Sequence, residues 1–236
     1  MGTCGLDLRK TLARSAAAVL AVLTLASCTA GETEAKADHL CDITPSSEED
    51  VLLREILGRG TAPGTDVDAF RTFIPNRTSR LVEKLGRELR EMDPAKETFA
   101  PSTCTFRPPT RSEGAAFSAG WAPRTSKFVE EPLREAGRFE VNGAFGQSNY
   151  FSTKLFVRCD MPGDLAEPSK TAWLYANASY VVNISPTEIL PADIDQAAKD
   201  RQTTLTYLMT RRVTEALGCE NKPLAKPPVV KRLPTP

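Results

Sequence analysis

The stretch "ADIDQAAKDRQTTLTYLMTRRVTEALG", Ala192 to Gly218, has the residue spacing of one long helix. Asp193 with Gln196 three residues later is typical of a capping box, and Gly218 is a typical residue at a helix C-terminus. Apolar side chains recur three or four positions apart, at Leu205, Leu208, Met209, Val213 and Leu217. Because these side chains form a single stripe, we expect the helix to lie across a sheet.

Upstream of this helix the apolar spacing has period two, which is typical of strands. The predicted strands are residues 114–123, 137–147, 150–159 and 171–184, with a fifth around 103–107. Short links at 147–149 and 161–170 favour antiparallel neighbours. We therefore expect an antiparallel meander of four to five strands, with Phe139, Val141 and Phe145 on one face of the second strand.

Two longer helices are predicted before the strands, with a short helix over residues 65–74 between them. The first opens with Thr44 as cap and Pro45 at the first helical position and ends at Gly58, with inward-facing Val51, Leu52, Leu53 and Ile56. The second covers residues 78–93, with Leu81, Leu85, Leu89 and Met92 on one side. N-terminal helices, an antiparallel sheet and a long C-terminal helix packed on it predict the α+β class.

Four cysteines outside the first 28 residues predict disulfides. Cys41, Cys104, Cys159 and Cys219 are separated by 63, 55 and 60 residues, without the close pairs of a zinc site, and no metal is expected. Three connectivities are possible. We favour Cys41 with Cys104 and Cys159 with Cys219, since each closes a loop worth about 4 kcal/mol in the chain-entropy estimate. Cys41 with Cys219 and Cys104 with Cys159 is the open alternative.

The N-terminus has the three zones of an export signal. Arg9, Lys10 and Arg14 precede the apolar run 15–26, which at about 12 residues is too short to span a bilayer. The run ends in Leu25-Ala26-Ser27-Cys28. These four residues resemble the lipobox of bacterial lipoproteins, and the resemblance implies cleavage between Ser27 and Cys28 and attachment of a diacylglyceryl group to the Cys28 thiol. Two or three acyl chains hold a protein firmly on a membrane.

The expected organisation has four parts. Residues 1–27 are a signal peptide, residues 28–40 a lipid-anchored spacer, residues 41–220 a single α+β domain, and residues 221–236 a proline-rich disordered tail. The layout and the Ala, Arg and Pro content are similar to those of small lipoproteins of high-GC Gram-positive bacteria. This resemblance concerns the fold level and does not carry a function.

Charge and missing motifs narrow the function classes. The chain has 30 basic and 30 acidic residues, and removal of the signal leaves 27 against 29, which argues against nucleic acid as a partner. The only histidine, His39, lies in the spacer, and phosphate-binding and nucleophile motifs are absent from the sequence, so we expect neither a catalytic residue nor a cofactor. The acid pairs Asp66/Asp68 and Asp193/Asp195 are interpreted as helix caps.

The remaining surface candidates are interpreted structurally. Trp121, Trp173 and Tyr175 are candidates for a binding face but are expected in the core, and the pair Arg211-Arg212 is expected on the solvated face of the last helix. The sequence thus predicts a membrane-anchored, extracytoplasmic, non-enzymatic binding or structural module. Its partners would be membrane lipid through Cys28 and an envelope protein or glycan. The alternative is a carboxylate-dependent envelope hydrolase or transferase.

Overall fold

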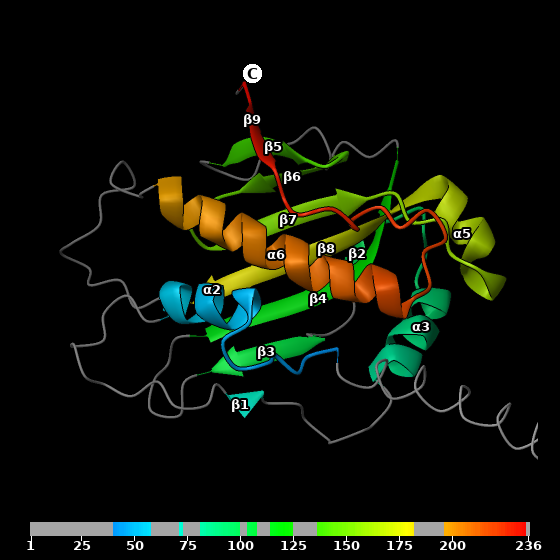
Figure 1. The fold of residues 1–236 in the computed structure, drawn as a ribbon. Coiled ribbons are helices and arrows are strands. Elements are labelled where there is room, and N and C mark those ends of the chain that lie inside the picture. The colour runs from blue at the N-terminus through cyan, green and yellow to red at the C-terminus, as the bar shows by residue number, and fades with distance from the viewer. Residues whose placement is uncertain are drawn as a thin grey trace, which may run out of the picture. The chain divides into compact units, whose positions relative to one another are not determined.

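A computed structural model describes residues 40–57, 71–72, 81–99, 103–107, 114–124, 136–181 and 196–234, all within the compact unit His39–Pro236. The α-helices among these residues are α2 (Glu48–Leu57), α3 (Leu81–Glu91), α5 (Ala166–Thr171) and α6 (Gln196–Ala216), and a 3-10 turn η2 (Gly163–Leu165) leads into α5. The long helix α6 crosses one face of the sheet (Figure 1). None of the described helices is both long and apolar enough to cross a membrane.

Nine strands form one antiparallel sheet in the described residues. They are β1 (Arg71–Thr72), β2 (Thr98–Phe99), β3 (Cys104–Arg107), β4 (Gly114–Pro123), β5 (Gly137–Val141), β6 (Ala144–Ser148), β7 (Ser152–Val157), β8 (Ala172–Val181) and β9 (Val230–Leu233). Their order is β1-β3-β4-β8-β7-β6-β5-β9, and β2 pairs with β4 next to β3. The α+β prediction is confirmed.

The strands β5 to β8 form a four-strand meander, and β3 is the predicted fifth strand. The predicted strand 137–147 is a hairpin instead. Asn142 and Gly143 both have positive φ, 48° and 83°, which is the backbone of a two-residue type I′ turn. This turn reverses the chain, so Phe139 and Val141 enter the main core whereas Phe145 joins a second cluster. The strand β4 lies on the far side of β8.

The apolar stripe of α6 is buried against the sheet as predicted. Leu205, Leu208, Met209 and Val213 are all buried, and Leu217 packs at the margin of the core. Tyr180 is hydrogen-bonded to α6 within this interface. The Tyr180 hydroxyl of β8 donates to the Gln202 carbonyl at 3.0 Å and is hydrogen-bonded to the Thr206 hydroxyl at 2.9 Å. Complete burial raises the pKa of Tyr180, which keeps this hydroxyl protonated.

The end of α6 is fixed by its cap and by a disulfide. Gly218 has φ 71°, the left-handed conformation that glycine adopts at low cost. The Cys219 N–H donates to the Thr214 carbonyl at 2.9 Å, and the Gly218 N–H donates to the Glu215 carbonyl at 3.1 Å, which together make a Schellman motif. Cys219 is then bonded to Cys159, just beyond β7.

The two longer N-terminal helices form with one change of boundary, whereas Arg71 and Thr72 of the predicted short helix 65–74 form strand β1 instead. α2 begins at Glu48, four residues after the predicted cap. The Ser47 hydroxyl accepts from the Asp50 N–H at 3.3 Å, and the Asp50 carboxylate accepts from the Ser46 N–H at 2.9 Å. This pair of bonds is the capping arrangement that sets the start. Leu53 and Ile56 are buried, but Val51 is 47% exposed, so its predicted inward orientation was wrong.

The predicted disordered tail, residues 221–236, differs from the structure, which describes this segment up to Pro234. Leu224 is buried in the main core, and β9 pairs with β5. Side chains hold the connection between them. The Asn142 amide donates to the Pro227 carbonyl at 2.7 Å, and the Tyr207 hydroxyl donates to the Lys226 carbonyl at 2.8 Å. Prolines exclude this segment from the interior of a sheet, because they lack a backbone N–H. An edge strand can still contain them nearby, because only one of its sides is hydrogen-bonded to the sheet.

Replacing Gly146 by alanine should destabilise the sheet strongly. A Cβ on Gly146 in β6 would overlap the Lys154 carbonyl oxygen and the Phe139 ring, whereas a Cβ on Gly137 in β5 meets nothing within 4 Å. Urea unfolding should therefore show a loss of about 2 kcal/mol or more for Gly146→Ala. Gly137→Ala should stay within about 0.5 kcal/mol of the original protein. Equal effects of the two substitutions would contradict the register of β6 and β7.

Candidate functional site

The structure contains both of the disulfides that the sequence favours. Cys41 is bonded to Cys104 with a Cα–Cα distance of 5.4 Å, and Cys159 is bonded to Cys219 with 5.2 Å. All four cysteines are buried. The first disulfide joins the start of the described chain to β3, and the second joins the end of α6 to the segment after β7. Each disulfide therefore links two chain segments that are 63 or 60 residues apart in the sequence.

The start of the described chain is also held by Arg212 of α6. Its guanidinium donates to the Asp42 carbonyl at 2.6 Å and to the Leu40 carbonyl at 3.5 Å, and it forms an ion pair with Glu49 at 3.3 Å. The prediction of a solvated face was wrong for Arg212, whose side chain is 22% exposed. The reason is tertiary: α2 and the segment before it pack on this side of α6. We call Arg212, Glu49 and the Leu40–Asp42 backbone the N-terminal clamp.

The electrostatics of the N-terminal clamp favour the charged form of Glu49. Burial alone would raise the pKa of Glu49. The hydrogen bond from its own backbone N–H, the Arg212 charge and the Ser47 hydroxyl outweigh burial, so the pKa lies below its ordinary value of 4.5. Since the folded-state pKa is lowered, the stabilisation from this carboxylate is present above pH 4.5 and is lost as the pH falls through the folded-state value.

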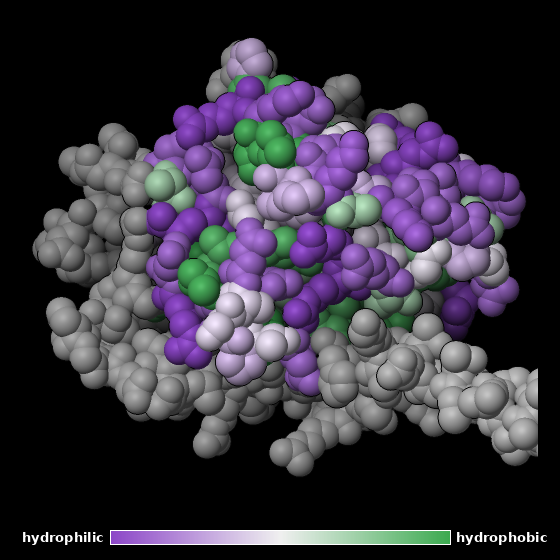
Figure 2. Space-filling model, viewed as in Figure 1, coloured by the Kyte–Doolittle hydropathy of each residue, from purple (hydrophilic) through white to green (hydrophobic). Residues whose placement is uncertain are grey.

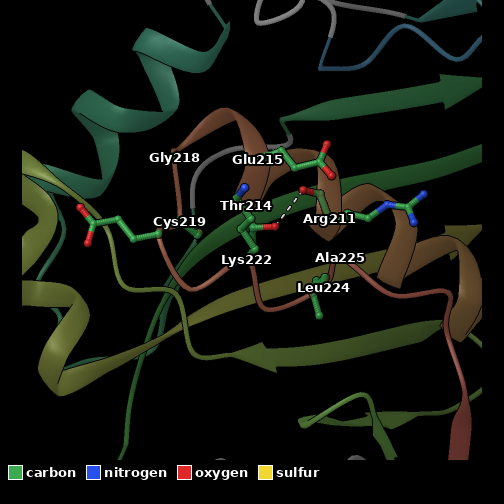
Figure 3. Close-up of a pocket in the computed structure, with 9 residues that line it drawn as sticks. Arg211, Thr214, Glu215, Gly218, Cys219, Lys222, Leu224 and Ala225 are labelled. Carbon is green, nitrogen blue, oxygen red and sulfur yellow. Dashed lines mark hydrogen bonds between the residues drawn. The ribbon is translucent and has the colours of Figure 1, made fainter.

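A cavity of about 400 Å³ opens at the C-terminal end of α6 (Figure 3). This volume is within the range of small-molecule sites. The last turns of the helix and the turn that follows it supply the lining. The lining residues are Arg211, Thr214, Glu215, Gly218, Cys219, Glu220, Lys222, Leu224 and Ala225.

The chemistry of this cavity is mixed in charge. Arg211 and Lys222 are cationic, and Glu215 and Glu220 are acidic and exposed. The Thr214 hydroxyl is already used, because it donates to the Arg211 carbonyl at 2.8 Å. An acid–base pair for hydrolysis needs at least one carboxyl group in apolar surroundings, which these two exposed acids lack. In the described part of the chain, three or more potential metal ligands do not cluster anywhere.

The face of the sheet opposite the main core carries a row of stacked aromatic rings. Phe145, Phe156 and Tyr175 lie opposite one another on β6, β7 and β8. Their ring centroids are 5.2 Å and 5.1 Å apart, with interplanar angles of 13° and 15°. Trp173 packs edge-on against Phe145 at 5.1 Å, and the Arg124 guanidinium lies 5.1 Å from the Trp173 ring.

A charged pair borders this aromatic row. Lys154 and Glu97 approach to 3.1 Å with side chains 18% and 12% exposed, and the Lys154 ammonium lies 5.6 Å from the Tyr175 ring centroid. Burial, followed by the charge of Glu97 and a hydrogen bond with it, raises the pKa of Tyr175. The tyrosine is therefore held protonated and does not supply a phenolate nucleophile. The second carboxylate oxygen of Glu97 and the indole nitrogen of Trp173 are buried without hydrogen-bond partners.

The sequence-predicted site residues fall into three groups. Ser27, Cys28, Asp66, Asp68, Asp193 and Asp195 lie outside the described residues. Trp121 and Tyr175 are buried as expected, with the Trp121 indole donating to the Leu89 carbonyl at 2.9 Å, and Trp173 is partly buried. The four cysteines form the two disulfides described above.

Sequence reasoning missed the N-terminal clamp and the Lys154–Glu97 pair. Both join residues that are distant in sequence, by 163 positions for Glu49 and Arg212 and by 57 for Glu97 and Lys154. The period-two spacing in β7 and β8 could have predicted that Phe156 and Tyr175 share a face of the sheet. Phe145 was assigned to the face of Phe139 and Val141, because the turn at Asn142 was not predicted.

No protein-family model, curated protein or solved structure matches this chain. The features that bear on function are therefore the chain's own: the predicted export signal with Cys28, the two disulfides, the polar cavity at the end of α6 and the edges of the sheet.

Arg212→Met should loosen the N-terminal clamp. Loss of hydrogen bonds from a charged donor should cost about 2 kcal/mol of unfolding free energy, measured in urea at pH 7. The neighbouring substitution Arg211→Met is the matched control, because Arg211 lines the open cavity, and it should cost no more than about 0.5 kcal/mol. Equal losses for the two variants would contradict the clamp.

The same variant should change the titration of Glu49. Carbon-detected NMR should give a pKa below 4.5 for this carboxyl group in the original protein. In Arg212→Met the pKa should rise, because burial continues to oppose ionisation and the compensating charge is gone. A pKa for Glu49 that is unchanged by the substitution would show that Arg212 does not act on it.

Proposed function

We propose that this protein is a lipid-anchored, extracytoplasmic binding module of the cell envelope. The observation that carries the proposal is the pair of disulfides in one small domain. Disulfides of this kind persist in oxidising compartments and are rare in the cytosol. The export zones and the lipobox-like Leu25-Ala26-Ser27-Cys28 independently support a location outside the cytoplasm.

The attachment of the domain fits an anchored protein. Only 12 residues separate Cys28 from Cys41, so a lipid on Cys28 would hold the domain close to the membrane. Cys41 is bonded to β3, and Arg212 holds the carbonyls on both sides of it. A force on the proposed spacer would therefore be carried by the sheet and α6, and residues 40–42 would stay in place.

Binding is favoured over catalysis by the state of the acids. Glu49, Asp50 and Glu97 are largely buried, and each is paired with a cation: Arg212, Arg54 and Lys154 respectively. The two acids of the cavity, Glu215 and Glu220, are exposed. These arrangements give no support to the carboxylate-dependent hydrolase, which stays a prediction from the sequence.

Hydrophilic residues predominate on the face that carries α6, and hydrophobic ones form small, separated groups there (Figure 2). Such a surface suits polar contacts with a partner more than a large apolar interface. The binding role proposed here is accordingly a polar one.

Metabolic labelling with an alkyne fatty acid in a bacterial host tests the anchor. The original protein should carry the label and partition into detergent, whereas Cys28→Ala should lose the label, because only a thiol accepts the diacylglyceryl group. Cys4→Ala is the matched control. Cys4 precedes the predicted cleavage site, so this variant should be labelled like the original. Equal labelling of Cys28→Ala, or loss of label in Cys4→Ala, would overturn the anchor.

A further inference from the structure

We infer that the outer edge of β9 docks an extended acidic segment of another protein, which pairs with it as an added strand. The inference deepens the proposed binding role and does not depend on the lipid anchor. Its basis is the position of β9, the direction of its backbone groups, its charge and its exposed aliphatic side chains.

β9 lies at one end of the strand order. It pairs with β5 through the register Val230↔Val141 to Leu233↔Arg138, and in the residues that the structure describes no strand pairs with its other edge. An open edge presents unpaired backbone groups that can accept a further strand. The prolines at 227, 228 and 234 limit this open edge to the segment 229–233.

The register assigns the backbone groups that face outward. The two-residue turn at Asn142 and Gly143 closes on the pair Val141↔Ala144, so Val141 directs its N–H and C=O toward β6. The next residue, Glu140, directs its groups toward β9, where it lies opposite Lys231. By alternation, Val230 and Arg232 direct their N–H and C=O away from the sheet, and these are the groups that an incoming strand would bond.

The charge of this edge selects an acidic partner. Residues 221–236 contain four cations and no acid, the cations being Lys222, Lys226, Lys231 and Arg232. Lys231 is exposed and has no ion-pair partner among the described residues. Arg232 pairs with Asp200 of α6 at 3.0 Å but is still 63% exposed. Opposite charges on facing strand positions stabilise a pair of strands, and like charges destabilise it.

Exposed aliphatic side chains add an apolar component. Val229 is 59% exposed and Leu233 is 38% exposed, and they stand on either side of Lys231 along the chain. Arg232 lies on the α6 side because it pairs with Asp200, so Lys231 and Leu233 lie on the other face. A partner strand with acids between small aliphatic residues matches this pattern.

A second copy of this chain does not match the edge. Two-fold antiparallel pairing of β9 with itself, centred so that the outward groups of Val230 meet those of Arg232, would place Lys231 opposite the Lys231 of the second copy, which brings like charges together. The position of the edge leaves room for another protein. β9 is six strand spacings from β3, which carries the Cys41 disulfide, or about 29 Å at about 4.8 Å per strand.

The test is an NMR titration of the purified, disulfide-intact, ¹⁵N-labelled protein with the probe peptide acetyl-TEVEVET-amide. Saturable shifts should appear in the amides of β9 and β5. The peptide acetyl-TKVKVKT-amide has the same strand propensity with inverted charge, and it should bind at least about tenfold more weakly. Inorganic polyphosphate serves as a probe for a purely anionic polymer.

Three variants separate backbone pairing from charge. Val230→Pro removes an outward N–H and leaves the Glu140↔Lys231 pairing, so binding of the acidic peptide should weaken about tenfold or more. Lys231→Gln removes the charge without placing a second acid opposite Glu140 of β5, and it should also weaken binding several-fold. Lys170→Gln, at an exposed lysine of α5, is the charge control and should bind like the original. Amide exchange of β5 and β9 checks that both strands stay paired in Val230→Pro.

Two results would overturn the inference. One is the absence of saturable shifts in β9 with the acidic peptide. The other is unchanged binding by Val230→Pro with polyphosphate binding as tightly as the peptide, which would make the segment a charge site for an anionic polymer. If the Cys28 labelling fails and the acidic peptide still binds, the lipid anchor is wrong and the docking edge stands. If the labelling succeeds and the peptide does not bind, only the docking edge is wrong.

Discussion

The packing of α6 across the sheet is the contact on which the other features depend. Its apolar stripe covers β8, β7 and β4, and the Cys159–Cys219 disulfide fixes its end. Side chains along the same helix hold three other segments: Arg212 holds Leu40 and Asp42, Tyr207 holds the backbone before β9, and Asp200 pairs with Arg232 of β9. The last turns of the helix line the cavity. A shift of this helix would therefore disturb the start of the described chain, β9 and the cavity together.

Much of the fold follows from local signals in the sequence. The apolar spacing of α3 and α6, the period-two strands and the glycine at 218 correctly predict the elements and the α+β class. The favoured cysteine pairing is also found. The missed features depend on contacts between distant residues. The turn at Asn142 splits a predicted strand, and β9 forms because Asn142 and Tyr207 hold its approach, which no local pattern of the proline-rich segment indicates.

The candidate sites were less predictable for the same reason. Arg212 looks like a surface residue on a helical wheel, and only the packing of α2 and the Cys41 segment makes it a clamp. Glu97 directly precedes β2 and Lys154 lies in β7, and they meet only through the tertiary arrangement of the sheet. The two sides of the sheet differ in this respect: β3 is disulfide-bonded to Cys41 at the start of the described chain, and β9 at the other end of the strand order carries the edge proposed for a partner.

Both the fold around α6 and the proposed extracytoplasmic location require that the domain is oxidised with the connectivity described. The most direct measurement is mass spectrometry of proteolytic fragments from protein recovered from the cell envelope, alkylated at once and digested without reduction. The account predicts cross-linked fragments joining Cys41 to Cys104 and Cys159 to Cys219, with little alkylation at these positions. Free thiols at the four cysteines, or fragments joining Cys41 to Cys219, would contradict it.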